Sequence, residues 1–408
     1  KVEFKSINWL IVKKISAKKI YLSLIFYLIL NSSPIHALDY KAYGFIQPET
    51  SVFFNGKGRH GQKNTNLSIF GKGTFISYLQ NDDAKFSINI LGRYDENDSE
   101  LRYLDFQKLK YEYFFNELEF KIGNDIIFWG VNETFNIVDI INQSNLAEDL
   151  AGTKKLGQTM ASLSYSHDYG KFDMYLMSNF QERLFSGGNG RPRLVMEIDK
   201  NTVTYESSAK DKKLDFAIRY STVLDDLDIG LSHFYGNNRA PELKANSSTL
   251  KFDPFYSIVS QTGLDIQSTK GSWLYKLESI SAKNGSERYF SAAGGIEYTF
   301  YGIQNTQSDL GIIIEYIFDD RSNSPLNNDG VIGLRWNKND IKSTTFLAGL
   351  LIDMHGNSTR LQSEFEQRIA DDLKLFVDFS INGNINQADF GYQFKEDSKM
   401  TVKIAKYF

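Results

Sequence analysis

Apolar and polar residues alternate with a period of two through most of this chain, in stretches of about ten residues that end in turns. Clear examples are residues 86–90, 118–122, 214–220, 360–369 and 373–381. Successive side chains of a β-strand point to opposite faces, so each stretch predicts a strand with one apolar and one polar face. No stretch after residue 37 has the pattern of a long helix.

The connections between these stretches alternate in length. Short turns, such as Asn81-Asp82-Asp83, Asn116-Glu117 and Asp168-Tyr169-Gly170, alternate with long loops. The long loops are residues 55–65, 129–158, 181–211, 237–253, 319–329 and 383–397. A soluble β-sandwich or propeller is the competing interpretation. However, no repeat of about 40–50 residues marks propeller blades, and alternating short and long connections are typical of outer-membrane barrels.

The sequence therefore predicts an all-β fold, a closed antiparallel transmembrane β-barrel with an inward-folded loop. The strands number about 18, with about 16 as the alternative, and either size leaves room for a water-filled channel. Bacterial single-chain barrels have even strand numbers, so a short piece at residues 389–394 is assigned to the last external loop.

The end of the chain is one of these strands. One face carries Met400, Val402, Ile404 and Phe408, and the other carries Thr401, Lys403 and Ala405. Lys406 departs from the pattern, but its long stem can reach water near a membrane boundary. This end resembles the terminal strand by which bacterial outer-membrane barrels are recognised for insertion. The resemblance implies lipid and the barrel-assembly machinery as partners.

The first 37 residues have the features of a secretory signal peptide. A lysine-rich start precedes an apolar run over residues 20–30, and Ala37 is a plausible cleavage point. A retained membrane anchor is the alternative, although a bilayer span needs about 20 apolar residues. We expect residues 38–408 to form the barrel, in the outer membrane of a Gram-negative bacterium.

Composition changes this interpretation little. The mean hydropathy of −0.36 is ordinary for a soluble protein, but only alternate residues of a barrel face lipid. The 31 Phe and 23 Tyr fit aromatic girdles. The net charge of −4 gives no support to nucleic-acid binding. Cysteine is absent from the chain.

The loop at residues 129–158 is rich in Ile, Phe and Leu and should not stand freely in water. Folded into the barrel mouth, it would form a pore constriction, for which Trp129, Gly130, Asp139 and Asn142 are the candidate residues. A cap over the outer rim is the alternative. Trp129 is expected to anchor the loop by packing.

The same stretch carries a resemblance to a known group. Trp129-Gly130 followed by Asp139-Ile140-Ile141-Asn142 resembles the loop of porin-like, mostly uncharacterised proteobacterial outer-membrane barrels, with Gln143 in place of the proline often found there. Further matches lie at residues 182–185, 190–193, 205–208, 228–231, 261–265, 273–278, 295–300 and 319–321. The resemblance implies a barrel with pore activity and names no substrate.

Charged residues offer candidate solute contacts. Arg183, Arg191 and Arg193 cluster in the Arg-rich external loop at residues 181–211 and could form a basic eyelet for carboxylates or phosphates. Solvated external arginines are the alternative. Charges expected on the lumenal faces of strands are of both signs, and include Arg219, Arg335, Arg360, Glu364, Arg368 and Lys374.

Catalysis has little support in the sequence. His36, His60, His167, His233 and His355 are scattered, without the spacing of metal ligands. Ser232 and His233 are adjacent strand residues and point to opposite faces, which rules them out as a dyad. A calcium site among Asp319, Asp320, Asn327, Asn328 and Asp329 competes with an ordinary polar loop, because the spacing is not that of an EF-hand. We expect no enzyme activity, cofactor or metal.

The sequence predicts a porin-like channel for passive diffusion of small hydrophilic solutes, with selection by size and charge at the loop. The alternative is a non-conducting outer-membrane barrel that acts as a scaffold, receptor or export-associated surface protein. The solute, the ion preference and the choice between monomer and trimer stay open.

Overall fold

The computed structural model describes residues 39–56, 58–59, 61–79, 83–321 and 324–408. The expected signal peptide at residues 1–37, His60, and Asn81 and Asp82 of one expected turn lie outside the described residues.

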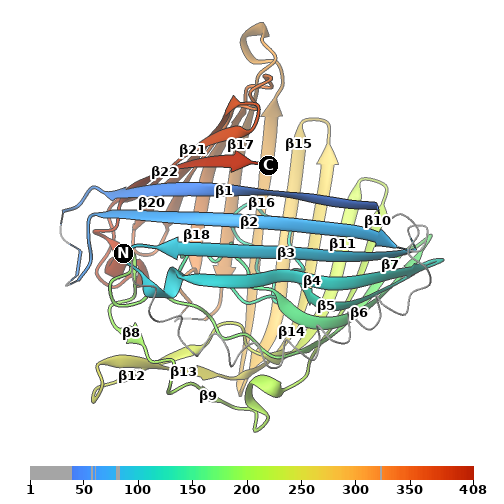
Figure 1. Ribbon diagram of the computed structural model, residues 1–408, viewed down its shortest axis with the longest axis horizontal. Coiled ribbons are helices and arrows are strands. Elements are labelled where there is room, and N and C mark those ends of the chain that lie inside the picture. The colour runs from blue at the N-terminus through green and yellow to red at the C-terminus, as the bar shows by residue number, and fades with distance from the viewer. Residues whose placement is uncertain (1–38, 57, 60, 80–82, 322–323) are drawn as a thin grey trace, which may run out of the picture.

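Within the described residues, 18 strands form one antiparallel sheet, and the pairing of β1 with β22 closes it into a barrel (Figure 1). The predicted closed barrel and the count of 18 strands, rather than 16, are confirmed. The barrel strands are β1 (Asp39–Phe53), β2 (Thr65–Leu79), β3 (Ala84–Asp95), β4 (Tyr103–Phe115), β5 (Leu118–Asp125), β6 (Gln158–His167), β7 (Gly170–Ser178), β10 (Asp215–Leu224), β11 (Leu227–Asn237), β14 (Ile258–Lys270), β15 (Trp273–Asn284), β16 (Glu287–Phe300), β17 (Asp309–Asp319), β18 (Asn328–Asn337), β19 (Thr345–Asp353), β20 (Thr359–Ala370), β21 (Leu373–Asn382) and β22 (Lys399–Tyr407).

Short turns join the strands at one end of the barrel, and the long loops lie at the other. The loops contain a small separate sheet that the alternation pattern did not predict, made of β8 (Glu197–Ile198), β9 (Thr204–Tyr205), β12 (Glu242–Asn246) and β13 (Lys251–Tyr256). It lies beyond the barrel at the lower edge of Figure 1. The other elements are the short 3-10 helices η1 (Ser99–Leu101), η2 (Lys210–Lys212), η3 (Ile303–Asn305) and η4 (Phe390–Phe394). Among the described residues, no helix is long and apolar enough to cross a bilayer.

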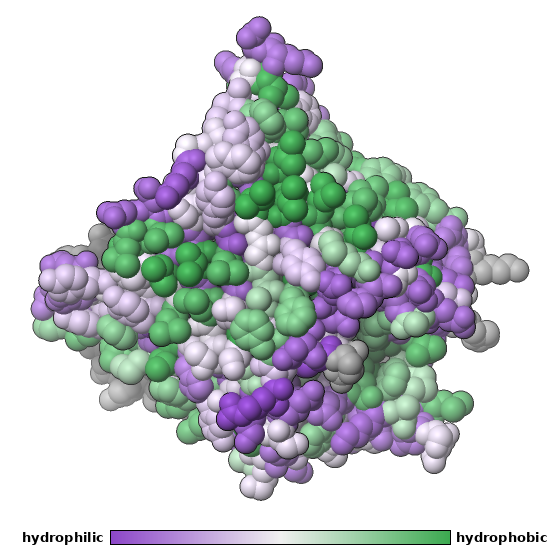
Figure 2. Space-filling model, turned by 180° about the vertical axis from the view of Figure 1, so that it is seen from behind, coloured by the Kyte–Doolittle hydropathy of each residue, from purple (hydrophilic) through white to green (hydrophobic). Residues whose placement is uncertain are grey.

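Strand register gives the barrel an apolar outside and a polar inside. A row of paired, exposed apolar residues on the outer surface is Tyr113, Phe120, Leu163, Met174 and Ile218. A row of paired residues one position away on each strand faces inward, and consists of Glu119, Ser164, Asp173, Arg219 and Ser232. Broad hydrophobic patches cover the outer face seen in Figure 2, and hydrophilic residues gather towards its tips.

The end of the chain closes the barrel. Phe408 donates its N–H to the Gly44 carbonyl at 3.0 Å, and the Gly44 N–H donates to the Phe408 carbonyl at 2.9 Å. A Cβ at position 44 would lie 3.0 Å from the Phe408 ring, so glycine makes room for that ring. Lys406 forms an ion pair with Asp372 in the turn between β20 and β21. Asp372 therefore balances the charge that Lys406 brings to an otherwise apolar face.

Candidate functional site

The loop between β5 and β6, residues 126–157, lies inside the barrel. Trp129, Val138, Ile140 and Ile141 are buried in one apolar cluster with inward side chains from β6, β7, β10, β11 and β14–β16. A second cluster joins Phe135 to β16, β17 and β18. The predicted inward fold of the loop is confirmed, because its apolar residues bury themselves against the wall rather than over the rim.

Two buried carboxylates on the wall hold the backbone of this loop. Glu278 of β15 accepts hydrogen bonds from the N–H groups of Val131 at 2.8 Å, Asn132 at 3.1 Å and Val138 at 3.1 Å. Glu315 of β17 accepts from Glu133 at 2.5 Å and Thr134 at 2.8 Å. These carboxylates supply acceptors that an irregular buried backbone lacks. Sequence reasoning missed their role, although Glu315 follows three isoleucines and stands out in an apolar strand.

Contacts of the residues predicted for the constriction hold the loop to itself and to the wall. Trp129 packs edge-on against Tyr175, and its N–H lies 3.4 Å from Asp139 Oδ1. Asp139 also pairs with Lys155 at 3.0 Å. Asn142 accepts from the Ile127 N–H at 2.8 Å and donates to the carbonyls of Asp125 and Leu156, each at 2.9 Å.

Gly130 has a φ of +146°, and a Cβ there would lie 2.4 Å from Asn136 Oδ1. The backbone conformation and the close approach both require glycine at this position. These contacts favour a role for Trp129, Gly130, Asp139 and Asn142 in the shape of the loop. Their effect on the width of a pore stays a prediction.

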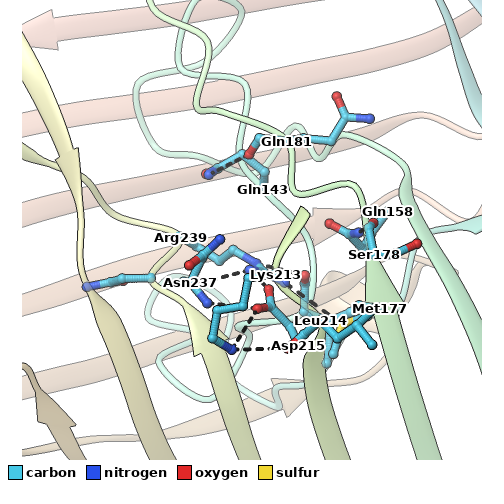
Figure 3. Close-up of polar contacts among 12 residues, drawn as sticks. Gln143, Gln158, Met177, Ser178, Gln181, Lys213, Leu214, Asp215, Asn237 and Arg239 are labelled. Carbon is cyan, nitrogen blue, oxygen red and sulfur yellow. Dashed lines mark hydrogen bonds and ion pairs between the residues drawn. The ribbon is translucent and has the colours of Figure 1, made fainter. Parts of the chain in front are cut away.

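A buried arginine ties the loop to the barrel at its outer end (Figure 3). Arg239 donates to Asp215 Oδ2 at 2.7 Å, to the Asn237 carbonyl at 2.8 Å and to the Ile141 carbonyl at 3.0 Å. Its guanidinium also lies over the rings of Phe180 and Phe234. Arg239 therefore connects the inward loop, the wall and the loop after β11, and no local sequence signal marked it.

Residues 145–154 form the tip of the inward loop. The bridge between Ser144 and Lys155, and the Asn145 N–H donating to the Lys154 carbonyl at 2.7 Å, bring the two ends of the tip together. Glu148 interacts electrostatically with Arg93 of β3. Asp149 interacts with Arg360 of β20 and Lys399 of β22. The tip thus carries charge towards the wall opposite the apolar clusters.

One part of the opposite wall is less closely packed. No residue of β19, β20 or β21 is buried, and these strands are described throughout. The apolar clusters of the loop lie along β6–β18, whereas the side chains of β19–β21 keep partial access to solvent.

The three arginines predicted as solute contacts bond to protein atoms. Arg183 Nε donates to Gln143 Oε1 at 3.0 Å, and burial lowers the pKa of its guanidinium to about 10. Arg191 pairs with Asp397 at 2.8 Å and also donates to Asn64 and to the carbonyls of Asn55 and Glu396. Arg193 donates to the carbonyls of Gly188, Leu194 and Val195. These bonds favour a role in joining loops, and contact with solutes stays a prediction.

Asp98 joins two external loops. Both of its oxygens accept from the Gly187 N–H at 3.2 Å, and Oδ1 accepts from Glu100 N–H at 2.9 Å. Burial, the largest effect, raises the pKa of Asp98 from 3.8 to about 6. The Gly187 hydrogen bond, Lys200 and Arg102 act in the opposite direction, and Asp95 adds to the increase.

The charged wall residues predicted from the sequence have these partners. Arg219 forms a bidentate pair with Asp265, both distances being 2.7 Å, and lies over the Trp129 ring. Arg335 pairs with Glu133 and Glu297, Lys374 with Glu366, and Arg360 with the Asn382 side chain. Glu364 interacts with Asp378, Lys403 and Lys154. Arg368 lies at a register shift in β20, near the turn.

The calcium alternative gains no ligand set. Asp319 pairs with Arg321, and in the described part of the chain no group of three or more acidic or histidine side chains is arranged to hold a metal ion.

No family model matches the chain, and no curated protein matches it. Among solved structures, the chain is similar to a mutant of the Rh. blastica porin, with 10% identity and a TM-score of 0.46 over 91% of this chain and 100% of that chain. A triple mutant of Rhodopseudomonas blastica porin has 12% identity and a TM-score of 0.45 over the same shares. Likeness at this level carries no argument about activity, so the function has to follow from the geometry of the lumen.

Proposed function

We propose that this chain is a porin-like channel of the bacterial outer membrane, through which small hydrophilic solutes diffuse passively. The observation that carries the proposal is a closed barrel with an apolar outer surface whose inward loop packs its apolar residues along β6–β18 and leaves no buried residue on β19–β21. Closure pairs the backbone N–H and C=O groups of every strand edge, and a chain in lipid requires this pairing because lipid offers no hydrogen-bond partners. A barrel of about 16–18 strands is wide enough for an aqueous channel.

Selection by size is proposed to arise at the tip of the inward loop, residues 145–154. The tip extends from the apolar clusters towards β3, β20 and β22 and narrows the lumen there. Selection by charge is supported by the groups that meet there, with Glu148 and Asp149 on the loop and Arg93, Arg360 and Lys399 on the wall. A solute passing between them meets both signs of charge.

The outer surface supports the proposed partners. Lipid would contact the exposed apolar row on the outside of the barrel. The barrel-assembly machinery would recognise β22, whose Val402 pairs with Thr50 of β1 and Val377 of β21.

The decisive experiment shortens the loop tip and leaves the contacts of the loop with Glu278 and Glu315 in place. Ser144 and Lys155 already pair as neighbours in an antiparallel bridge, so residues 145–154 can be replaced by Asn-Gly, which favours a tight turn. In planar bilayers, the wild-type protein should give stepwise conductance, and the shortened protein should give larger steps. Equal steps would remove the constriction role of the tip.

A matched control shortens a loop outside the lumen. Residues 247–250 join β12 to β13, and replacing them with Asn-Gly should leave the conductance step unchanged. A non-conducting barrel is the alternative function, and the extensive packing of the loop on β6–β18 favours it. Unmeasurable conductance from protein that keeps its heat-modifiable gel mobility would decide for that alternative.

A further inference from the structure

Three lysines meet in the lumen beside the inward loop. Lys72 of β2 pairs with Phe45 of β1 and Leu91 of β3, and Lys108 of β4 pairs with Asn89 of β3. Lys154 is exposed at the end of the loop tip. Gln107, next to Lys108 on β4, donates to the Lys155 carbonyl at 3.3 Å, which places the end of the loop tip beside this wall.

Two of these lysines, Lys72 and Lys154, differ from other cations of the lumen because they have no ion-pair partner among the described residues. Arg93 pairs with Glu49, and Arg219 pairs with Asp265. In contrast, no carboxylate of the described residues lies within ion-pair distance of Lys72 or Lys154.

Lys108 and Lys154 have only partial compensation. Asp125 lies 3.5 Å from Lys108 Nζ, but 2.7 Å from Lys110 Nζ, so its charge is shared. Glu148 and Glu364 act on Lys154 without forming an ion pair with it. None of the three lysines therefore has an ion-pair partner of its own among the described residues.

We propose that Lys72, Lys108 and Lys154 form a binding site for a small oxyanion with two negative charges, such as phosphate or a short dicarboxylate. This inference rests on the proposed channel function and names the solute class that its constriction favours. A lysine ammonium acts as a compact point charge towards such anions. A dianion among three ammonium groups would replace their mutual repulsion with attraction.

The position of Lys154 makes the site part of the permeation path. Lys72 and Lys108 belong to the wall, whereas Lys154 belongs to the loop that narrows the lumen. An anion would bind between the two sides of the narrowing. Arg183, Arg191 and Arg193 already donate hydrogen bonds to protein atoms, which leaves these lysines as the more available cations.

The test measures single-channel KCl current in planar bilayers while inorganic phosphate, succinate or acetate is added. Phosphate or succinate should reduce the current of the wild-type protein at saturating concentration, and monovalent acetate should not. The dianion that blocks the current at the lower concentration, phosphate or succinate, is the one that the site prefers. Lys72→Gln and Lys154→Gln should each raise the half-blocking concentration by about tenfold, since each removes one charge from the site. Lys338→Gln, which removes a lysine that pairs with Asp340 in the turn between β18 and β19, should leave it unchanged.

Each outcome decides between the two proposals. A conducting protein on which the dianions act no more than acetate overturns the anion site and leaves the channel standing. A folded protein that does not conduct overturns the channel. In that case, phosphate is titrated calorimetrically into the folded wild-type protein and into folded Lys72→Gln. The site is supported if the wild-type protein gives a binding heat that the substitution abolishes, and any other result overturns it. Heat-modifiable gel mobility verifies that each variant is folded.

Discussion

Replacement of Glu278 by glutamine tests how the inward loop is held. Glu278 is fully buried, and its Oε1 accepts from the N–H groups of Val131 and Asn132 while its Oε2 accepts from Val138. Glutamine keeps the shape of the side chain but has one acceptor oxygen. Its amino group would then face at least one backbone N–H, so donor would meet donor.

The size of the effect follows from these three bonds. A hydrogen bond to a charged group contributes about 1.5–3 kcal/mol, and a buried donor left without an acceptor costs about 1–3 kcal/mol. Loss of one bond, with the others changed from charged to neutral acceptors, should weaken the docking of the segment at 131–138 by about 2–4 kcal/mol. Since about 1.4 kcal/mol corresponds to a factor of ten, local amide protection should fall about 30- to 700-fold.

Hydrogen–deuterium exchange with mass spectrometry measures this protection directly, on peptides that cover residues 131–138. Glu366→Gln serves as the control, because Glu366 pairs with Lys374 on the wall and not with the loop. The control should exchange like the wild-type protein in this segment. Equal protection in Glu278→Gln and the wild type would refute the idea that the carboxylate holds the loop.

Further predictions concern other contacts of the loops. Trp129→Ala should destabilise the protein to urea by about 3–5 kcal/mol, because it empties a buried aromatic site, and Trp129→Phe should cost less. Gly130→Ala should lower the urea midpoint as well, because it combines a strained φ with a clash at Asn136, and an unchanged midpoint would contradict this. Burial raises the pKa of Asp98 from 3.8 to about 6 while the loop at residues 181–211 is docked on it. At a pH between these two values, the Asp98 carboxyl group holds a proton in the docked protein and releases it when the loop comes away. Stability from this group is therefore greatest at low pH and is lost as the pH rises through about 6. Protease cleavage within residues 181–211 should be slower at pH 5 than at pH 7.5, and Asp98→Asn should remove that difference.

The sequence was sufficient to predict the barrel because strand alternation is a local signal. Phe120 and Lys121 fall on opposite faces whatever lies elsewhere in the chain, and their cross-strand partners Leu163 and Ser162 repeat the same alternation. The terminal strand was predictable for the same reason. The sheet of β8, β9, β12 and β13 was not, because its strands are short and pair loops that are distant in the sequence.

The candidate site was predictable only in part. The apolar composition of the loop indicated that it folds inward, since hydrophobic residues in a long loop have to find a surface to cover. The groups that bind the loop could not be found in this way, because Val131 and Glu278 are separated by 146 other residues. Arg191 illustrates the opposite case, since its charge suggested a solute contact, while its ion-pair partner Asp397 lies 206 positions further along the chain.

The manner in which the loop is held follows from the alternation that builds the barrel. An irregular segment inside a barrel buries backbone N–H groups that no strand pairs with, and these groups need acceptors. Inward positions of the wall include charged as well as apolar side chains, so β15 and β17 present carboxylates where the loop passes. Glu278 and Glu315 meet this need, and Lys276 at 3.7 Å partly balances the charge of Glu315. The apolar clusters fix which wall the loop covers, whereas the carboxylates fix its register along that wall. The position of the charged tip across the lumen is therefore determined as much by the wall as by the loop, and substitutions on β15 or β17 should alter permeation without touching the tip.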